Sequence, residues 1–494
     1  MSTNDRILNL PVRTVGIVGG GVAGLVTAKQ LGQAGFECTV FERGDRVGGV
    51  WTVGYHGFGL QTPRSFYEFP DWPMPDSYPD LPTGAQMQAY VDGYARHFGL
   101  TERIRFGRRV SAIEPAAEGT GWHIAHTDAN GNRGERDRFD YVVIANGLYA
   151  TPYVPELPDR DRFGGEVMHS SEYHDPAHIR GRKVVVVGFG KSALDIAVDA
   201  KNHGADVTLV FRDAHWPVPV KVLGLIDVRK IFMTRAAGAF LPLYQRPGPW
   251  EARLHQRAPW LVSGFWRGVE GLLRLQYRIG RAGALPSTRF ENDLFTGGIL
   301  PTDDTYPLLR SGQVQPRRGQ IERFTDTGVQ LDDGDRIDTD VVVFATGWQR
   351  DDSLLPAPVR AQLDDDGLYL YRHILPVGVP NLAFIGWAST YSNSLTSHLT
   401  GLWLTHLLTG RIAAPEAEAM AREVADMKRW KRGFMPSLSC RGSMLQLHMW
   451  HFHDELLTDM GLPARRKSNP VAELFGDYGP ADYAGLFTAA APAP

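Results

Sequence analysis

The sequence predicts an α/β protein whose core consists of two separate parallel-sheet units, and three observations lead to this prediction. An apolar strand, Val15 to Val18, runs into a glycine-rich turn and then into a helix pattern. The same order of strand, glycine turn and helix returns later, beginning with the strand from Lys183 to Val187. A third apolar strand follows at 340–344, after a long segment without this pattern. The 494 residues are ample for several domains of this kind.

The composition is that of an ordinary globular protein, with 43% hydrophobic and 22% charged residues. A net charge of -3 argues against a nucleic-acid-binding protein. The two cysteines, Cys38 and Cys440, supply neither a disulfide framework nor a cysteine-rich metal site, so no metal is expected. No signal-peptide pattern and no apolar run of roughly 18 residues is present, and we therefore expect a cytoplasmic protein.

The first unit predicts a site for a dinucleotide. Gly19, Gly21 and Gly24 stand between strand and helix, where the backbone must turn tightly and approach a pyrophosphate at the helix N-terminus. The next strand, 38–41, ends at Glu42, whose carboxylate is placed to accept a hydrogen bond from a ribose hydroxyl. These residues leave open whether the dinucleotide is a flavin or a nicotinamide nucleotide.

An irregular aromatic segment, residues 54–82, follows the first unit. Its prolines exclude long helices. Such a segment either lines a ligand site or wraps the surface with aromatic anchors, and its composition fits both. The pattern after it predicts a helix over 86–98 and strands over 105–110, 122–127 and 141–145.

The second unit predicts a second dinucleotide site of different specificity. Gly188 and Gly190 form its glycine turn, and Lys191 and Ser192 open the helix that follows. The next strand ends at Arg212, where the first unit has a carboxylate. A carboxylate repels a 2′-phosphate whereas an arginine attracts one, and Lys191 adds to the positive field. The second unit is therefore predicted to bind NADPH rather than NADH.

Residues 216–290 interrupt the pattern with a mainly helical insertion. Between Lys221 and Arg289, Lys and Arg outnumber Asp and Glu by twelve to three, and aromatic residues such as Trp250 and Trp260 are interleaved with them. Three interpretations fit this composition: peripheral contact with an anionic membrane surface, a lid over a ligand site, or a homodimer contact.

The remaining chain returns to strands. The buried strand at 340–348 is predicted to leave its sheet at Ala-Thr-Gly, and 381–386 is predicted to form one more short strand. A helix pattern over 394–408 has an N-terminus that could point at a cofactor. The His-x-His-Asp run at 451–454 is interpreted as surface packing, because no further metal-ligand partners accompany it.

The connector between the two units carries the pattern F-x-G-x-x-x-H-x-x-x-Y in Phe163, Gly165, His169 and Tyr173. Together with the two dinucleotide units, this pattern resembles the flavin-containing monooxygenases, the class B flavoprotein monooxygenases with two dinucleotide-binding domains. The resemblance extends through Ala-Thr-Gly-Trp at 345–348 and covers most of the chain. The related Baeyer–Villiger enzymes carry Trp where this chain has Tyr173, which favours the branch that oxygenates nitrogen or sulfur.

The resemblance implies two Rossmann-like domains, with FAD in the first and NADPH on the second. The FAD-binding domain would be discontinuous, covering 1–175 and 336–494, with the NADPH-binding domain at 176–335. NADPH would reduce FAD, which would take up O2 as a C4a-hydroperoxide and pass one oxygen atom to an amine nitrogen or a sulfide. The substrate would be a small or medium lipophilic molecule, as for N,N-dimethylaniline monooxygenases.

The cofactor-binding residues predicted from the two units and the resemblance form one set. They are Gly19, Gly21, Gly24, Glu42, Arg43, Gly49, Trp51, Val110, Gly188, Gly190, Lys191, Ser192, Arg212, Thr346 and Gly347.

Gln61 is the predicted catalytic residue. Much of the family has an asparagine beside the flavin, just before the aromatic segment, and counting back from Pro63-Arg64 and from 71–73 puts Gln61 at that place. Glutamine offers the same amide one methylene further out. The alternative is that Gln61 only packs the loop. For His169 the resemblance favours a structural role between the two domains over acid–base chemistry.

Two other functions stay open. One is Baeyer–Villiger oxidation of a ketone, and the other is an FAD-binding NADPH oxidase or electron-transfer protein without an oxygenated product. A flavin-dependent disulfide reductase is disfavoured, because no Cys-x-x-Cys pair accompanies the first unit.

Overall fold

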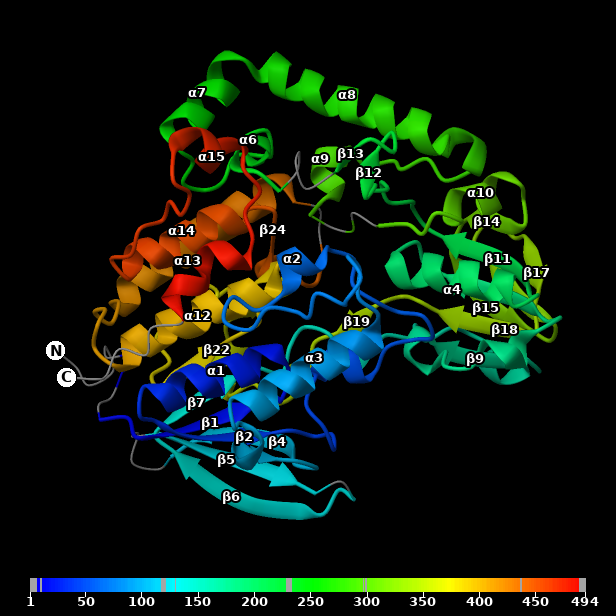
Figure 1. Cartoon of the computed structure of the whole chain (residues 1–494). Helices are drawn as coiled ribbons and strands as arrows, with labels where there is room; N and C mark the ends of the chain where they lie inside the picture. Colours follow the sequence, from blue (N-terminus) through cyan, green and yellow to red (C-terminus); the bar gives the residue numbers. More distant parts are fainter. Residues whose placement is uncertain are drawn as a thin grey trace.

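Two five-stranded parallel sheets form the core of the protein (Figure 1). The computed structural model describes residues 7–8, 11–116, 121–128, 130–227, 233–295, 297, 300–435 and 438–487. Each sheet has helices on one face and a three-stranded antiparallel sheet on the other. This arrangement confirms the predicted α/β class with two Rossmann-like domains.

The first sheet has the strand order β22-β7-β1-β2-β3. Its strands are β1 (Thr14–Val18), β2 (Glu37–Phe41), β3 (Ile104–Arg105), β7 (Tyr141–Ile144) and β22 (Leu382–Phe384). Val15 and Ile17 pack on the side of the helices, and Val18 packs on the opposite side. Both faces of β1 are therefore buried, as its continuous apolar run predicts.

Three helices cover one face of the first sheet: α1 (Val22–Gln33), α3 (Gly84–His97) and α12 (Asn393–Leu408). A capping box between Thr83 and Gln86 fixes the start of α3. The other face packs against β4 (Arg109–Pro115), β5 (Trp122–Thr127) and β6 (Arg133–Phe139). The single strand predicted at 105–110 is divided between β3 and β4, because the chain turns at Gly107 with a positive φ of 65°.

The second sheet repeats this plan with the order β14-β11-β10-β18-β9. Its strands are β9 (Glu166–His169), β10 (Lys183–Val187), β11 (Asp206–Phe211), β14 (Val314–Arg318) and β18 (Val341–Phe344). The helix α4 (Lys191–Asn202) lies on one face. The hairpins of β15 (Ile321–Thr325), β16 (Gly328–Leu331) and β17 (Arg336–Asp338) lie on the other.

The domain boundaries differ from those drawn on the sequence. Both β9 and β18 belong to the second sheet, where they pair with each other, so boundaries at 175 and 335 cut across that sheet. The chain crosses between the sheets at β8 (Thr151–Pro152) and β19 (Trp348–Gln349), which pair antiparallel. A buried apolar strand predicts a parallel sheet but does not reveal which sheet it joins.

The insertion lies between β11 and β14 and is mainly helical, as predicted. Its elements include β12 (Lys221–Val222), β13 (Ile226–Asp227), α6 (Arg235–Gly238), α7 (Pro249–Arg257), α8 (Pro259–Tyr277) and the start of α9 (Phe290–Asp293). The segment after it contains α10 (Thr305–Arg310). In Figure 1, α8 crosses the top of the molecule from the C-terminal helices toward the second sheet. Pro259 separates α7 from α8, since the residue before a proline avoids the helical conformation.

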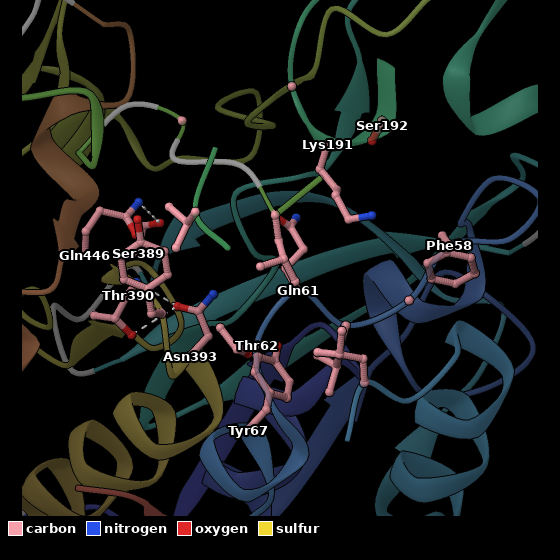
Figure 2. A pocket seen from close by; sticks show the side chains of 18 of the residues that line it. Phe58, Gln61, Thr62, Tyr67, Lys191, Ser192, Ser389, Thr390, Asn393 and Gln446 are labelled. Carbon is pink, nitrogen blue, oxygen red and sulfur yellow. Dashed lines mark hydrogen bonds between the residues drawn. The ribbon is translucent and has the colours of Figure 1, made fainter. Parts of the chain in front are cut away.

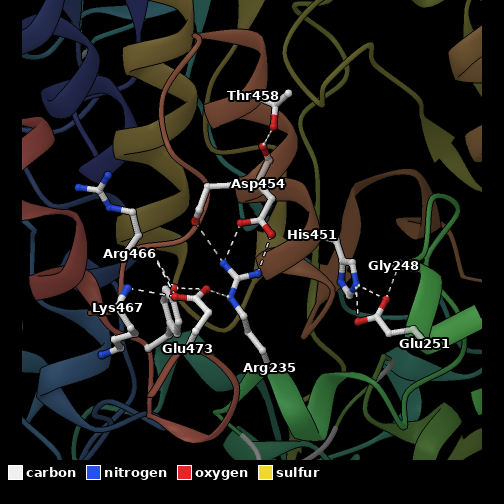
Figure 3. Close-up of polar contacts among 11 residues, drawn as sticks. Arg235, Gly248, Glu251, His451, Asp454, Thr458, Arg466, Lys467 and Glu473 are labelled. Atoms are coloured by element: carbon white, nitrogen blue, oxygen red, sulfur yellow. Dashed lines mark hydrogen bonds and ion pairs between the residues drawn. The ribbon is translucent and has the colours of Figure 1, made fainter. Parts of the chain in front are cut away.

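Ion pairs join the insertion to the helices at the C-terminal end of the chain (Figure 3), namely α13 (Ala417–Phe434), α14 (Met449–Asp459) and α15 (Pro470–Phe475). Arg235 of α6 contacts Asp454 at 2.6 Å and Glu473 at 2.9 Å. Glu251 of α7 pairs with His451 at 3.0 Å.

The interpretation of the His-x-His-Asp run as surface packing is wrong for His453, which is fully buried. The described part of the chain contains no group of three or more His, Cys, Asp or Glu side chains that could hold a metal ion. Among the described helices none is long and apolar enough to cross a membrane.

Candidate active site

The strand, glycine turn and helix of each dinucleotide unit are called its cradle, the first beginning at Val15 and the second at Lys183. The first cradle has the backbone geometry of a phosphate-binding turn. Gly19 has a φ of +109°, and a Cβ there would lie 2.6 Å from the carbonyl oxygen of Ala145, so only glycine fits. The helix α1 starts after Gly21, and no side chain caps it. Its first amide groups are therefore left for a ligand phosphate.

The predicted acid of the first cradle is held in place by its own turn. Glu42 accepts hydrogen bonds from the amides of Gly20 and Gly44, each at 2.7 Å. An ionised carboxylate has further acceptor positions, so Glu42 can still bind a ribose hydroxyl. Arg43 donates to the carbonyl oxygen of Ala150 at 3.3 Å. The side chain of Val110 is buried in the core, which leaves only its backbone for contact with a ligand.

The second cradle repeats this geometry. Gly188 has a φ of +128°, and a Cβ there would lie 2.6 Å from the carbonyl oxygen of Ala345. Gly190 precedes α4, which also has no side-chain cap. Both cradles therefore fit the phosphates of a dinucleotide.

One cavity of about 590 Å³ is lined by residues of both domains, and the second cradle opens onto it at Gly190. The first domain contributes Trp51 and Gln61 to its lining, and the second contributes Lys191 and Ser192. Figure 2 shows Gln61, Lys191 and Ser192 around the cavity. Trp51 lies in a single turn of 3₁₀ helix that begins at Gly49 and packs against Phe58 and Tyr67. Apolar side chains of the insertion and the segment after it complete the wall: Val218, Val220, Met233, Phe290, Leu294 and Leu300.

Lys191 and Arg212, predicted to form one positive field, lie apart. Lys191 lines the large cavity and its ammonium group pairs with Asp195. Burial raises the pKa of Asp195, although Lys191 opposes this effect. Arg212 lines a separate open cleft together with Arg318 and Gln320. Lys191 thus does not share a cleft with Arg212, and the 2′-phosphate site at Arg212 stays a prediction.

The comparisons with known proteins decide the family. The family model described as flavin-binding monooxygenase-like matches residues 12–236 and 299–465. The chain belongs to this family. The matched ranges contain both cradles and leave out most of the insertion, so the prediction of a flavoprotein monooxygenase is confirmed.

Relatives of this flavin-binding monooxygenase match over nearly the whole chain. A probable flavin-containing monooxygenase 1 of Arabidopsis thaliana is 29% identical, covering 95% of this chain and 96% of the relative. Dimethylaniline monooxygenase [N-oxide-forming] 2 of Rattus norvegicus is 26% identical, covering 94% of this chain and 85% of the relative. These relatives agree with the predicted FAD- and NADPH-dependent enzyme class.

Solved structures share the fold. An oxidised steroid monooxygenase bound to NADP has a TM-score of 0.68 at 20% identity, covering 91% of this chain and 98% of the other. S-allyl-L-cysteine S-oxygenase from Allium sativum has a TM-score of 0.61 at 21% identity, covering 92% and 90%. The OTEMO structure in complex with FAD and NADP has a TM-score of 0.64 at 18% identity, covering 85% and 89%.

In this monooxygenase the side chain of Gln61 faces the cavity, where it can contact a bound ligand. Its side chain is exposed to the cavity, and within the described residues it has no hydrogen-bond partner. Figure 2 shows Gln61 between Lys191 of the second domain and Thr62 of the first. The amide is therefore free to bind a ligand, and its catalytic role stays a prediction.

Residues of the connector form hydrogen bonds with the segments in which the chain crosses between the two sheets. The Nε2 atom of His169 lies 3.0 Å from the carbonyl oxygen of Gly347, and Nδ1 lies 3.1 Å from the amide nitrogen of Ser171. Burial lowers the pKa of His169, so the ring is neutral and donates through Nε2. Thr346 donates to the carbonyl oxygen of Tyr153. This geometry supports a structural role for His169, because both ring nitrogens are already engaged.

Sequence reasoning did not find three groups of this site. Tyr55 donates to Asp195 at 2.7 Å and so joins the aromatic segment to α4. Arg318 lies beside Arg212 because β14 and β11 are neighbouring strands. The position of Arg318 at the end of a strand was the feature of the sequence that could have predicted it. Asn393 and Gln446 line the cavity from segments distant in sequence from both cradles.

Proposed function

We propose that the protein is an NADPH- and O2-dependent flavin monooxygenase that transfers one oxygen atom to an amine nitrogen or a sulfide of a small or medium lipophilic substrate. One observation carries the proposal: Trp51, which follows the first cradle, and Gly190 of the second cradle line the same cavity of about 590 Å³. A hydride donor on one cradle and a redox ring on the other can then meet, with room left for a substrate.

The residues of the two cradles divide the cofactors between them. FAD is assigned to the first cradle, with its phosphates at Gly19–Gly21 and a ribose at Glu42. NADPH is assigned to the second, with its phosphates at Gly190 and its 2′-phosphate between Arg212 and Arg318. Bound flavin supplies the reduction of O2 and the transfer of oxygen, while the protein orients the reactants and excludes water.

The cavity wall favours a lipophilic substrate that carries a soft nucleophile. The insertion contributes mostly apolar side chains and one carboxylate, Asp227. No nucleophile with an adjacent general base stands in the described lining for a reaction independent of the cofactors. Amides and hydroxyl groups gather at Ser389, Thr390, Asn393 and Gln446, on the left of Figure 2.

A substrate panel tests this proposal. Purified enzyme with FAD and NADPH is supplied with a tertiary amine, an aryl methyl sulfide or a cyclic ketone, and the N-oxide, sulfoxide and lactone are quantified. We expect N-oxide or sulfoxide in near-equal amount to the NADPH consumed. Lactone alone would establish the Baeyer–Villiger alternative, and hydrogen peroxide alone would establish an NADPH oxidase.

We also propose that the outer surface of α7 and α8 contacts an anionic membrane surface, with the protein at the periphery of the cytoplasmic side. Trp260 and Leu275 expose 73% and 69% of their surface there, with the exposed Arg257 and Arg274 nearby. The acids of these helices, Glu251 and Glu270, are buried. Apolar and basic side chains without exposed acids fit anionic lipid better than the same basic surface of a second copy.

Vesicle flotation tests the membrane proposal. The protein should float with vesicles containing phosphatidylserine and much less with phosphatidylcholine alone, and Trp260→Ser with Leu275→Ser should abolish flotation. Equal binding to both vesicle types would contradict the proposal. A concentration-dependent dimer that these two substitutions dissociate would instead assign the surface to a second copy.

A further inference from the structure

A chain of buried hydrogen bonds ends at the cavity in the side chain of Asn393. The Nε2 atom of His453 lies 2.9 Å from the hydroxyl oxygen of Thr396, which lies 2.8 Å from that of Thr390. Thr390 donates to Oδ1 of Asn393 through its amide at 2.9 Å and through its hydroxyl at 3.4 Å. His453, Thr396 and Thr390 are buried, and Asn393 lines the cavity.

The donor and the acceptor of each of these hydrogen bonds can be assigned, starting from the ring of His453. The Nδ1 atom of His453 is buried without a partner. A proton there would be an unpaired buried donor, so the proton of the neutral ring belongs on Nε2. Burial lowers the pKa of His453 to about 3, which keeps the ring neutral at any working pH. The ring then donates to Thr396, Thr396 to Thr390, and Thr390 to Asn393.

These donors fix the orientation of the Asn393 amide. Its Oδ1 atom accepts from the amide of Thr390, and a flipped side chain would set two donors against each other. The NH2 group must therefore face away from Thr390. Figure 2 shows the Asn393 amide directed into the cavity on the side of Gln61, and among the described residues its Nδ2 atom has no acceptor.

The position of Asn393 in the fold points to what it serves. After β22 the chain passes Gly386, where a Cβ would lie 2.7 Å from the side chain of Ala23 in the first turn of α1. It then enters α12 at Asn393. Asn393 thus belongs to the first domain. The segment that leads to it leaves β22, the edge strand of the sheet that carries the first cradle.

We propose that Asn393 is a hydrogen-bond donor to the redox ring of the bound flavin, and that Thr390, Thr396 and His453 are the positioning residues that orient it. The inference rests on the proposed function, which assigns FAD to the first cradle. A flavin gains negative charge when it is reduced. A donor held in place by a chain of hydrogen bonds, which also polarises its N–H group, stabilises that charge. Asn393 therefore favours the reduced form of the cofactor.

The midpoint potential of bound FAD tests this inference independently of turnover. In the FAD-bound protein, Asn393→Ala should lower the ratio of reduced to oxidised flavin at a fixed potential by about tenfold, which is about 30 mV for a two-electron couple. Thr396→Val, which removes only a buried hydroxyl, should change the ratio in the same direction by about threefold. Thr405→Val is the matched control, since Thr405 lies on the same helix and donates to the carbonyl oxygen of Gly401.

The outcomes separate the inference from the proposed function. Equal potentials in wild type, Asn393→Ala and Thr396→Val would overturn the inference, including when the KM for substrate rises, because the amide would then serve the substrate. If Asn393→Ala does not retain FAD, the comparison of Thr396→Val with Thr405→Val decides. Failure of the wild-type enzyme to form an oxygenated product would contradict the proposed function and leave these potentials as a separate result.

Discussion

Gln61 and Asn393 both line the cavity from the first domain, but they come from different parts of the chain. Gln61 lies in the aromatic segment beside its cradle, so counting along the chain was enough to predict it. Asn393 starts a helix far away in sequence, and only the parallel pairing of β22 with β7 brings it to the same cavity. Gly19 and Glu42 were predicted from the local pattern of strand, glycine turn and helix, whereas Gln61 was predicted from the family resemblance.

Substitution of Gln61 tests its predicted catalytic role. Loss of an amide donor in a water-poor site costs about 1–3 kcal/mol, so Gln61→Leu should lower the rate of oxygenation about tenfold to a hundredfold. Gln61→Asn, which keeps the amide, should retain much more activity. The measurement is oxygenated product formed per NADPH consumed, at equal FAD content. Equal coupling in Gln61→Leu and wild type would mean that Gln61 only packs the loop.

Arg212 and Arg318 test the assignment of the 2′-phosphate. Arg212→Ala should raise the KM for NADPH about tenfold to a hundredfold, because a charge-assisted hydrogen bond contributes about 1.5–3 kcal/mol. Arg318→Ala should act in the same direction but less strongly, since Arg318 also binds Asp213 at 2.8 Å. The KM for NADH should change little in both variants. A parallel rise for NADH would show that the cleft does not recognise the phosphate.

At the scale of elements, hydrogen bonds join α4 to the aromatic segment of the first domain and to the connector. Asp195 accepts from Tyr55 at 2.7 Å, and one helical turn further Asp199 accepts from Tyr173 at 2.9 Å. Both tyrosines come from segments outside α4 that precede it in the chain. The sequence predicted Tyr173 as part of a connector, but it gave no sign of which carboxylate its hydroxyl would meet.

Asp195→Asn tests whether this contact positions the cofactors. The substitution keeps an acceptor for Tyr55 but leaves the half-buried Lys191 without its anion. We expect the rate of flavin reduction by NADPH to fall about tenfold, equivalent to about 1.4 kcal/mol. Anaerobic stopped-flow absorbance measures the rate, with Asp199→Asn as the comparison variant. An unchanged rate in Asp195→Asn would contradict the role of this contact.

The base of the insertion provides a test by pH. Nδ1 of His215, just before the insertion, lies 2.8 Å from Asp293, which also accepts from the amide of Trp216 at 2.7 Å. Burial lowers the pKa of His215, but the hydrogen bond and charge of Asp293 outweigh this, and the pKa is raised. The stabilisation is therefore present below the ordinary histidine pKa of about 6.5 and is lost as the pH rises through the raised value.

The difference in melting temperature between wild type and His215→Asn measures this effect. We expect a clear difference at pH 5.5 that becomes smaller at pH 8.5, because the imidazolium–carboxylate pair is lost as His215 deprotonates. A difference that grows with pH would contradict the assigned direction of the shift.

At the scale of the whole molecule, the sequence predicted the two-domain plan but not its boundaries. Apolar strands and glycine turns are local patterns, and they identified both cradles and the helical insertion. The partners of β9 and β18 depend on sheet pairing between segments far apart in the chain, which no local pattern encodes. The cavity is lined by segments that lie far apart in the chain, so its lining residues could not be predicted from local patterns.

The fate of molecular oxygen tests the central claim most directly. The FAD-bound enzyme is given NADPH, an aryl methyl sulfide and ¹⁸O2 in ordinary water, and the sulfoxide is analysed by mass spectrometry. The account predicts one ¹⁸O atom in each sulfoxide molecule and about one sulfoxide for each NADPH consumed. NADPH consumption that yields labelled hydrogen peroxide and no labelled product, across amines and sulfides alike, would contradict it.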